Sequence, residues 1–433
     1  MILLANGTII NFNPARVDIN TDVAIEGNKI VAIGKRLALQ YPNAESIDLK
    51  EKIIIPGLVC SHNHFYSSLA RGMLATIKPS GNFVEMLENL WWKLDRALDD
   101  KLLYCSGMIG ALDAIKSGTT AVVDHNSSPN FIKGSLSVLR EAFEENGLRG
   151  ILCYEITDRN GKTGMKDGLQ ESLDFADSIK DTDLIEAAIG GHASFSLSDE
   201  SLKNISEVVK KTGKGFHIHV GEDKYDADHS EENYSKSILE RLDSFNLLNG
   251  KSILAHGIWL NEKDLQILNK RKSFLVHNPR SNMNNHVGYL KSISEVKNLA
   301  IGTDGIGADM FEETRFAYFK SKEENLNLSP GDFVNYLWSG NKILERYFNK
   351  KFGKVAKDYT ADLIICDYNP PTPLTKENTA EHFLFGFSSK NVESVIINGR
   401  FVYCDRAFPI VINRVYNKSK KSAIKLWKKM DEL

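Results

Sequence analysis

The chain has 433 residues, of which 42% are hydrophobic and 25% are charged, as is typical of a globular protein. This composition excludes a mostly disordered chain, a collagen and a coiled coil as the dominant class. Lys and Arg number 54 against 56 Asp and Glu, so the net charge is -2. No basic excess favours nucleic acid as a partner.

The cysteines and the first residues point to a reducing compartment. An odd number of cysteines with no C-x-x-C pair argues against a disulfide framework and against a cysteine-type zinc site. The opening MILLANGTII has no cationic start, and we interpret it as a first strand and not as a signal peptide. No window approaches the ~18 apolar residues of a membrane span. We expect a cytoplasmic protein without a membrane partner. The five cysteines are Cys60, Cys105, Cys153, Cys366 and Cys404.

Both ends of the chain have the texture of strands and turns. Residues 1–56 contain the β-branched runs MILLANGTIINF, DVAIEGNKIVAIGK and SIDLKEKIII, separated by Asn and Gly turn signals. The same texture returns in ADLIICD and VESVIINGRFVYCD. We therefore predict one small β-sandwich domain built from residues 1–56 and 352–412. Residues 413–433 read as a cationic amphipathic helix, and we interpret its lysines as a solvated face.

The middle of the chain, residues 57–351, alternates short apolar runs with longer charged segments of helical spacing. Strands alternating with helices indicate βα units and a parallel sheet. Eight such units are the count of a (β/α)8 TIM barrel, so the predicted class is α/β, with the active site at the carboxyl ends of the strands. The eight runs are PGLVCSH, TTAVVDH, GILCYE, IEAAIGGH, GFHIHVGE, SILAHG, FLVHNP and AIGTDG.

Histidines gather at the ends of these runs, and two H-x-H pairs occur, at His62/His64 and His217/His219. H-x-H on a strand places both imidazoles on one face, because side chains alternate with period two. Together with histidines and Asp304 at other strand ends, the pattern predicts one divalent metal site. Imidazoles plus a carboxylate suit Zn²⁺, Fe²⁺ or Mn²⁺ and leave a position open for water.

The motifs PGLVCSHNH, HIHVGE, LAHG, HNPRSN and GTDG, in this order, resemble the metal-dependent amidohydrolase superfamily. The closer similarity is to its deaminase branch, which includes cytosine, guanine and S-adenosylhomocysteine deaminases and triazine chlorohydrolases. PGLVCSHNHFYSSLARG and NLWWKLDRALDD are similar, more narrowly, to the aminohydrolases linked to selenium metabolism. The resemblance covers nearly the whole chain, including the split β-sandwich.

Carried over residue by residue, the resemblance implies a set of metal ligands. His62 and His64 would bind the metal from the first strand, His219 from the fifth and Asp304 from the eighth. Relatives with two metals bridge them with a modified lysine at the end of the fourth strand, where this chain has His192 in IGGHAS. We therefore expect one ion per chain, zinc above all, with iron or manganese as alternatives.

The resemblance also implies the catalytic and substrate-binding residues. Glu222 matches the H-x-x-E proton shuttle, and Asp304 would accept the proton of the attacking water. His256 matches the histidine that orients the water or the substrate, and contact with the metal is left open. His192 matches a histidine beside the substrate. His277, with Pro279, Ser281 and Asn282, matches a loop motif without an assigned role.

Several other residues have both a structural and a functional interpretation. His217 is interpreted as a packed residue behind the ligands. For His125 a substrate contact and a structural hydrogen bond are equally open. Trp91, Trp92 and Asp95 could wall the pocket, although two adjacent tryptophans in a helical pattern are also typical of a core.

The predicted function is that of a mononuclear metal-dependent hydrolase of C–N bonds that deaminates a small N-heterocycle and releases ammonia. One alternative keeps the metal but acts on a cyclic amide or a triazine-like substrate, by ring opening, dechlorination or removal of an alkylamine. Another is a non-catalytic assembly partner with the same fold. The expected partners are a small heterocyclic substrate and a second copy of the chain in a homodimer.

Overall fold

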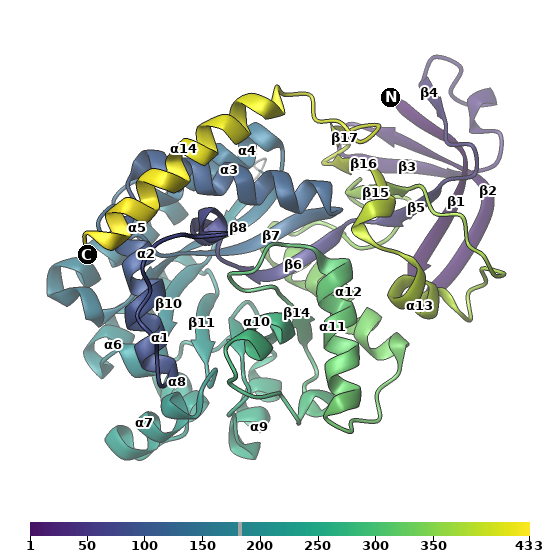
Figure 1. The fold of residues 1–433 in the computed structure, drawn as a ribbon. Helices are drawn as coiled ribbons and strands as arrows, with labels where there is room; N and C mark the ends of the chain where they lie inside the picture. The colour runs from purple at the N-terminus through teal and green to yellow at the C-terminus, as the bar shows by residue number, and fades with distance from the viewer. Residues whose placement is uncertain (181–183) are drawn as a thin grey trace.

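The computed structural model describes residues 1–180 and 184–433, and these form two sheets. A nine-stranded parallel sheet occupies the centre of the molecule, and an eight-stranded sheet lies beside it, at the upper right of Figure 1. Helices surround the central sheet, as expected for a barrel built from βα units.

The central sheet follows chain order from β6 to β14, and each of its strands is parallel to the next. A parallel bridge between Asn63 and Asp304 joins its two edges and closes the barrel. The predicted α/β barrel is thereby confirmed, with its strands at the eight apolar runs. The strands are β6 (Leu58–Asn63), β7 (Thr119–Asn126), β8 (Arg149–Ile156), β10 (Ile189–Ala193), β11 (Phe216–Val220), β12 (Ile253–His256), β13 (Phe274–His277) and β14 (Leu299–Ile301), with the short β9 (Ile185–Ala187) on β8.

The helices carry clear start and stop signals. In α6, Ser198 caps the first turn by accepting a hydrogen bond from the Ser201 amide, and Gly213 ends the helix in the left-handed region at φ 65°. The helices are α1 (Phe83–Met86), α2 (Trp92–Ala97), α3 (Asp100–Lys116), α4 (Ser135–Asn146), α5 (Gly161–Ser178), α6 (Asp199–Thr212), α7 (Lys224–Tyr234), α8 (Ile238–Ser244), α9 (Glu262–Arg271), α10 (Pro279–Asn284), α11 (Met310–Glu323), α12 (Pro330–Phe348), α13 (Thr379–Glu381) and α14 (Ile412–Asp431).

The second sheet joins both ends of the chain. Strand β5 pairs antiparallel with β15, in the register Ile55 to Ile364. Strand β1 is long enough to pair β4 with its first half and β5 with its second half. The prediction that the termini build one sheet-based unit is confirmed, while its boundaries stay predictions. The strands are β1 (Ile2–Phe12), β2 (Ala15–Glu26), β3 (Lys29–Gly34), β4 (Glu45–Asp48), β5 (Ile53–Pro56), β15 (Leu363–Cys366), β16 (Val392–Ile397) and β17 (Arg400–Tyr403).

The interior of the barrel is a packed core and not a pore. Val59, Val123 and Ile253 of the strands pack with Ile343 and Tyr347 of α12, which covers the amino-terminal end of the barrel. The carboxyl ends of the strands are the side at which a TIM barrel binds its ligands. Across the described ranges, no helix is long and apolar enough to cross a bilayer.

Candidate metal centre and active site

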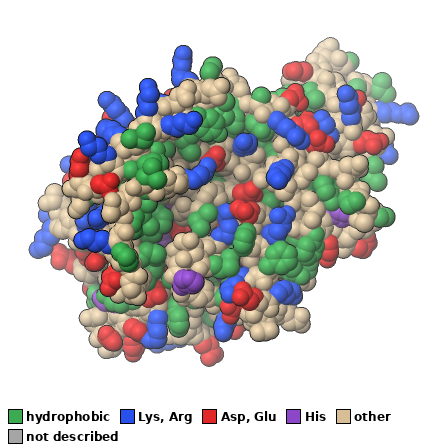
Figure 2. Space-filling view, in the orientation of Figure 1, with side chains coloured by type: hydrophobic (Ala, Val, Ile, Leu, Met, Phe, Trp, Pro, Cys, Tyr) green, Lys and Arg blue, Asp and Glu red, His purple; other side chains and the backbone are tan. Residues whose placement is uncertain are grey.

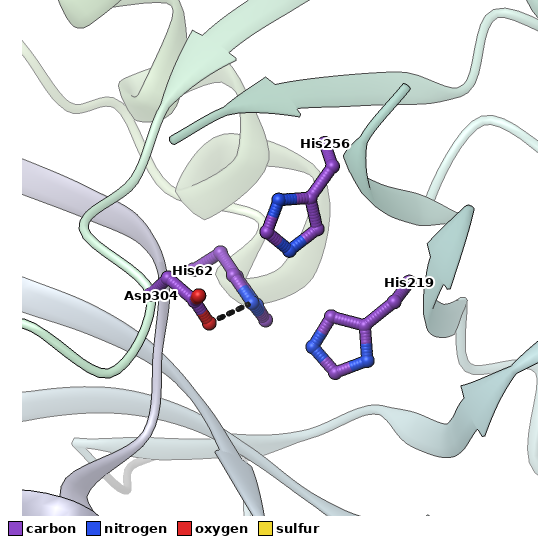
Figure 3. A group of neighbouring side chains, drawn as sticks. All are labelled: His62, His219, His256 and Asp304. Carbon is purple, nitrogen blue, oxygen red and sulfur yellow. Dashed lines mark ion pairs between the residues drawn. The ribbon is translucent and has the colours of Figure 1, made fainter. Parts of the chain in front are cut away.

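Four polar side chains converge at the carboxyl ends of the barrel strands (Figure 3). His62 lies on β6, His219 on β11, His256 at the end of β12, and Asp304 three residues after the end of β14. Their donor atoms all lie within 4.8 Å of one another, and the three histidines are buried. The barrel topology thus gathers residues that are up to 242 positions apart in the chain.

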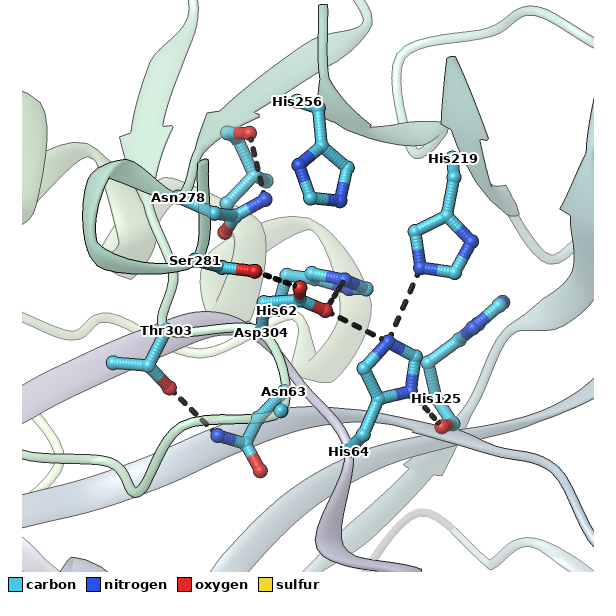
Figure 4. Close-up of polar contacts among 12 residues, drawn as sticks. His62, Asn63, His64, His125, His219, His256, Asn278, Ser281, Thr303 and Asp304 are labelled. Carbon is cyan, nitrogen blue, oxygen red and sulfur yellow. Dashed lines mark hydrogen bonds and ion pairs between the residues drawn. The ribbon is translucent and has the colours of Figure 1, made fainter. Parts of the chain in front are cut away.

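His64, the remaining predicted ligand, lies against the same cluster. Its Nε2 atom is 2.9 Å from Asp304 Oδ1 and 3.1 Å from His219 Nε2 (Figure 4). His62 Nε2 is 3.2 Å from the same carboxylate oxygen. Five side chains therefore surround one point, and four of them are the predicted ligand set.

The backbone at two of these residues is held in an uncommon conformation. His256 has φ 72° and Asp304 has φ 54°, in the left-handed region that costs a residue other than glycine free energy. Backbone hydrogen bonds stabilise this conformation: the amide of Gly257 donates to the carbonyl oxygen of Val220, and the amide of Asp304 donates to that of His62. Such strain turns the side chains of His256 and Asp304 into the barrel mouth.

The hydrogen bonds of the histidines decide which ring nitrogen faces the cluster. His64 Nδ1 lies 2.6 Å from the carbonyl oxygen of His125, and His219 Nδ1 lies 2.6 Å from that of His192. Because a carbonyl only accepts, each Nδ1 carries the hydrogen and each Nε2 is directed at the cluster. His256 Nδ1 is bound in the same way, 2.8 Å from Asn282 Oδ1.

This donor set fits a divalent ion. Burial lowers the pKa of His62 to about 3 and that of His219 well below its ordinary value, so both imidazoles are neutral and have a free lone pair. Within the described part of the chain, the buried Nε2 atoms of His62 and His256 have no hydrogen-bond partner. Burial alone would lower the pKa of His64, but the hydrogen bond to Asp304 raises it to about 9, and an ion in this place would displace that proton.

A pocket opens over the cluster, with an empty volume of about 510 Å³ that includes space open to solvent. Two tryptophans from the segment before α3 form one side, and histidines and carboxylates form the floor. The lining residues are His64, Tyr66, Leu87, Trp91, Trp92, Asp95, Glu155, His192, His219, Glu222, Asn285, Asp304 and Gly305.

Glu222 lies in the bend that follows β11 and lines the pocket beside the cluster. Its Oε2 is 3.5 Å from His256 Nε2, and its Oε1 accepts a long hydrogen bond of 3.4 Å from Asn285. Burial raises the pKa of Glu222 to about 7. A carboxyl group in this environment can hold a proton near neutral pH.

Some of the predicted substrate-binding residues line the pocket, and one does not. His192 and Trp92 line the pocket, with ring centroids 6.2 Å apart, and Asp95 lines it beside them. His125 is fully buried and does not line this pocket; its Nδ1 is 3.3 Å from Glu155 Oε2. The geometry therefore favours the structural reading of His125, and its substrate contact stays a prediction.

Glu155 and Arg159 were not singled out in the sequence. Burial raises the pKa of Glu155, but His192, His125 and Arg159 outweigh it and hold the pKa at about 2. Arg159 pairs with Asp95 and stacks over Trp92, with its guanidinium carbon 5.0 Å from the ring centroid. Glu155 ends the run GILCYE, a position like those of the strand-end histidines, so a signal for it existed. No pattern in the sequence marks Arg159.

A closed barrel with a cluster of histidines and a carboxylate at its strand ends defines the class of barrel proteins that can hold a divalent metal ion there. The model of the amidohydrolase family matches residues 53–402, and the chain belongs to that family.

Individual relatives match nearly end to end. The chain is 31% identical over 411 residues to the 5-methylthioadenosine/S-adenosylhomocysteine deaminase of Thermococcus sibiricus, covering 93% of each chain. It is 31% identical over 448 residues to the 5'-deoxyadenosine deaminase of Methanococcus aeolicus, covering 100% of each. The zinc-bound structure of an adenosine deaminase from Xanthomonas campestris superposes with a TM-score of 0.86 at 20% identity, covering 99% of this chain and 98% of that one.

Proposed function

We propose that this chain is a mononuclear metal-dependent deaminase that replaces the exocyclic amino group of an adenosine-type nucleoside with oxygen. The observation that carries the proposal is the placement of Glu222 on the pocket wall, within 3.5 Å of His256 and beside the histidine and carboxylate cluster. The full-length relatives that bear deaminase names support the same reaction.

The residues that would hold the ion are His62, His64, His219 and Asp304, with His256 close enough to join them. Zinc suits neutral imidazoles and one carboxylate, and the strand end at His192 offers no lysine to bridge a second ion. A bound ion would lower the pKa of a water molecule toward ~7 and so supply a nucleophile at neutral pH.

Two carboxyl groups divide the proton transfers. Asp304 accepts the proton of the attacking water, because its other contacts, to His62, His64 and Ser281, keep it anionic. Glu222 gives its proton to the ring nitrogen next to the attacked carbon, takes up the second proton of the attacking oxygen and delivers it to the departing ammonia. The proton left on Asp304 returns to Glu222 at the end of the cycle. His256 orients the oxygen between them, with its ring held by Asn282. One water is consumed, one C–O bond forms and one C–N bond breaks.

The pocket wall can take a planar heterocycle. Trp92 and His192 offer ring surfaces on which a base can pack. Among the described residues, Asp95 Oδ1 and Trp92 Nε1 are buried and have no hydrogen-bond partner, so an acceptor and a donor remain for polar groups of the substrate. A purine that carries a sugar offers a planar ring system for the ring surfaces and polar groups for the acceptor and the donor.

A substrate screen tests the proposal. Purified protein with its metal content measured is incubated with 5'-deoxyadenosine, 5'-methylthioadenosine, S-adenosylhomocysteine, guanine and a triazine, and ammonia and products are quantified. We expect one ammonia per product from at least one adenosine-type nucleoside. Release of chloride or an alkylamine from the triazine alone would contradict the proposal, and so would the absence of ammonia from every compound.

A further inference from the structure

A relay of buried side chains lies behind the cluster, on the side away from the pocket. His62 Nδ1 is 2.9 Å from His217 Nε2, and His217 Nδ1 is 3.5 Å from Cys153 Sγ. The thiol in turn lies 3.6 Å from the backbone oxygen of Asp124. His62, His217 and Cys153 are fully buried and come from β6, β11 and β8.

The carbonyl oxygen of Asp124 determines which atom donates and which accepts in each hydrogen bond of this relay. The Asp124 oxygen is a carbonyl and can only accept, so the Cys153 thiol donates to it. The sulfur can then accept the Nδ1 hydrogen of His217, which leaves His217 Nε2 as an acceptor. His62 must therefore carry its hydrogen on Nδ1, and its Nε2 is left free toward Asp304.

His62 differs from two other histidines of the cluster in the group that holds its ring. His64 and His219 are each held by a backbone carbonyl, which cannot change its hydrogen-bonding role and cannot be removed by substitution. His62 is held by an imidazole that can itself exist in two tautomers. The free Nε2 of His62 consequently depends on the identity of side chains 217 and 153.

We propose that His217 and Cys153 are positioning residues, which lock His62 in the tautomer whose Nε2 can bind the metal ion and keep its ring aimed at the cluster. The inference rests on the proposed function, because it takes His62 to be a metal ligand. Partners of this kind behind a ligating histidine typically change metal affinity by 10–100-fold when they are removed.

A second metal ion is the competing explanation of the same side chains. Donor atoms of His125, Cys153 and His217 also lie within 4.8 Å of one another. Both nitrogens of His217 are already engaged, however, by His62 and Cys153, so His217 has no lone pair to spare in the arrangement seen here. The number of ions per chain separates the two explanations.

The test compares variants that remove the relay with variants that keep it. His217→Leu removes the acceptor, whereas His217→Gln places an amide oxygen near the position of the lost Nε2. Cys153→Ala removes the sulfur and Cys153→Ser keeps an acceptor. Cys366→Ala is the matched control, a fully buried free cysteine in the second sheet.

Three measurements are made on each variant: the number of zinc ions per chain, the zinc dissociation constant by competition with a chelator, and the visible spectrum of the cobalt-substituted protein. Thermal unfolding of the metal-free protein reports the packing cost separately. We expect zinc binding about 10–100-fold weaker and an altered cobalt spectrum in His217→Leu, a smaller change in Cys153→Ala, and near wild-type behaviour in His217→Gln, Cys153→Ser and Cys366→Ala.

Some results would overturn the inference. Wild-type affinity and spectrum in both His217→Leu and Cys153→Ala, with only the metal-free protein destabilised, would reduce the relay to packing. If His217→Leu does not fold, Cys153→Ala against Cys153→Ser decides alone. Two ions in the wild type and one in Cys153→Ala would make the cysteine a ligand. A wild-type protein that binds no ion would overturn the proposed function itself, and the inference with it.

Discussion

Two carboxyl groups at the mouth of the barrel differ in what surrounds them. Burial raises the pKa of both, but in Asp304 the contacts with His62 and His64 outweigh burial and hold the pKa well below its ordinary value. Glu222 has weaker partners, and burial raises its pKa to about 7. A pair of acids whose pKa values are pushed apart in this way can divide the roles of proton acceptor and proton donor.

Glu222→Gln tests the proton transfer. The amide keeps the size and the hydrogen bond to Asn285 but cannot transfer a proton, so we expect unchanged metal content and a rate of ammonia release lower by ~10²-fold or more. Glu231→Gln, an exposed residue on α7, serves as the control and keeps wild-type turnover. Near-normal turnover in Glu222→Gln would remove the shuttle role, and loss of metal would make Glu222 a ligand.

The residues of this site differ in how visible they are in the sequence. His62, His64, His219, His256 and Asp304 each stand at or just after the end of an apolar run, so the barrel prediction alone brings them together. Arg159 acts through contacts with Asp95 and Trp92, which come from a distant segment. Such pairing depends on how helices dock on the barrel, and no local pattern encodes it.

At the scale of elements, the C-terminal helix α14 holds the helices that carry the pocket wall. Lys425 and Lys429 each place Nζ 2.8 Å from the carboxylate of Asp99, which also caps α3 by accepting from the Leu102 amide. Trp427 donates from Nε1 to the Leu69 carbonyl. Figure 2 shows blue Lys and Arg side chains gathered along this helix. Some lysines of this run thus face solvent, whereas Lys425 and Lys429 bind Asp99 at the start of α3; we call these two ion pairs the clamp.

Asp99→Asn tests this clamp. Asparagine still caps a helix but has no charge, so the variant isolates the ion pairs, whose contribution we expect to be about 1 kcal/mol. Burial would raise the pKa of Asp99, but the hydrogen bonds from Lys425, Lys429 and the Leu102 amide outweigh it and hold the pKa at about 2. The contribution of the lysines is therefore complete above the unfolded pKa of Asp99, near 3.9, and is lost as pH falls toward 2.

The measurement is urea unfolding of the wild type and the variant at several pH values. The difference in stability should be constant from pH 7 to about pH 5 and should shrink below about pH 4. Asp100→Asn, in the exposed first turn of the same helix, is the control and should change stability much less. A difference that does not depend on pH would contradict the ion-pair explanation.

At the scale of the whole molecule, the barrel and the second sheet are joined by a buried ion pair. Arg149 of β8 donates from Nε to Asp362 at 2.8 Å and from Nη2 at 3.1 Å, and the amide of Asn398 donates to the same carboxylate. The chain also passes from β5 to β6 through Gly57 alone, where a Cβ atom would lie 2.1 Å from the Thr120 hydroxyl oxygen. The two sheets therefore depend on each other for stability.

Asp362→Ala should destabilise the protein by about 3–5 kcal/mol, because it leaves the fully buried guanidinium of Arg149 without its counter-charge. The control is Asp367→Ala, which breaks an exposed pair with Arg406 and should cost about 1 kcal/mol or less. Urea unfolding of both variants gives the comparison. Equal effects would show that the Arg149–Asp362 pair does not hold the sheets together.

The fold, like the site, has features that the sequence predicts and features that it does not. The barrel strands are short runs such as those ending at His62 and His125, bounded by turn signals, and these are readable from the chain. The pairing of β5 with β15 followed from the matching texture of the two ends. The docking of α14 on α3 and the burial of Arg149 did not, because a cationic side chain in a sequence looks the same whether it is solvated or paired.

The metal dependence of ammonia release tests most directly whether the strand-end cluster is the catalytic centre. With 5'-deoxyadenosine as substrate, protein stripped of metal by a chelator should release ammonia at least ~10²-fold more slowly, and added zinc should restore the rate. His219→Ala should neither bind zinc tightly nor recover, whereas His229→Ala, a half-buried histidine on α7, should recover like the wild type. Undiminished ammonia release from the metal-free protein, or normal zinc content and turnover in His219→Ala, would contradict the assignment.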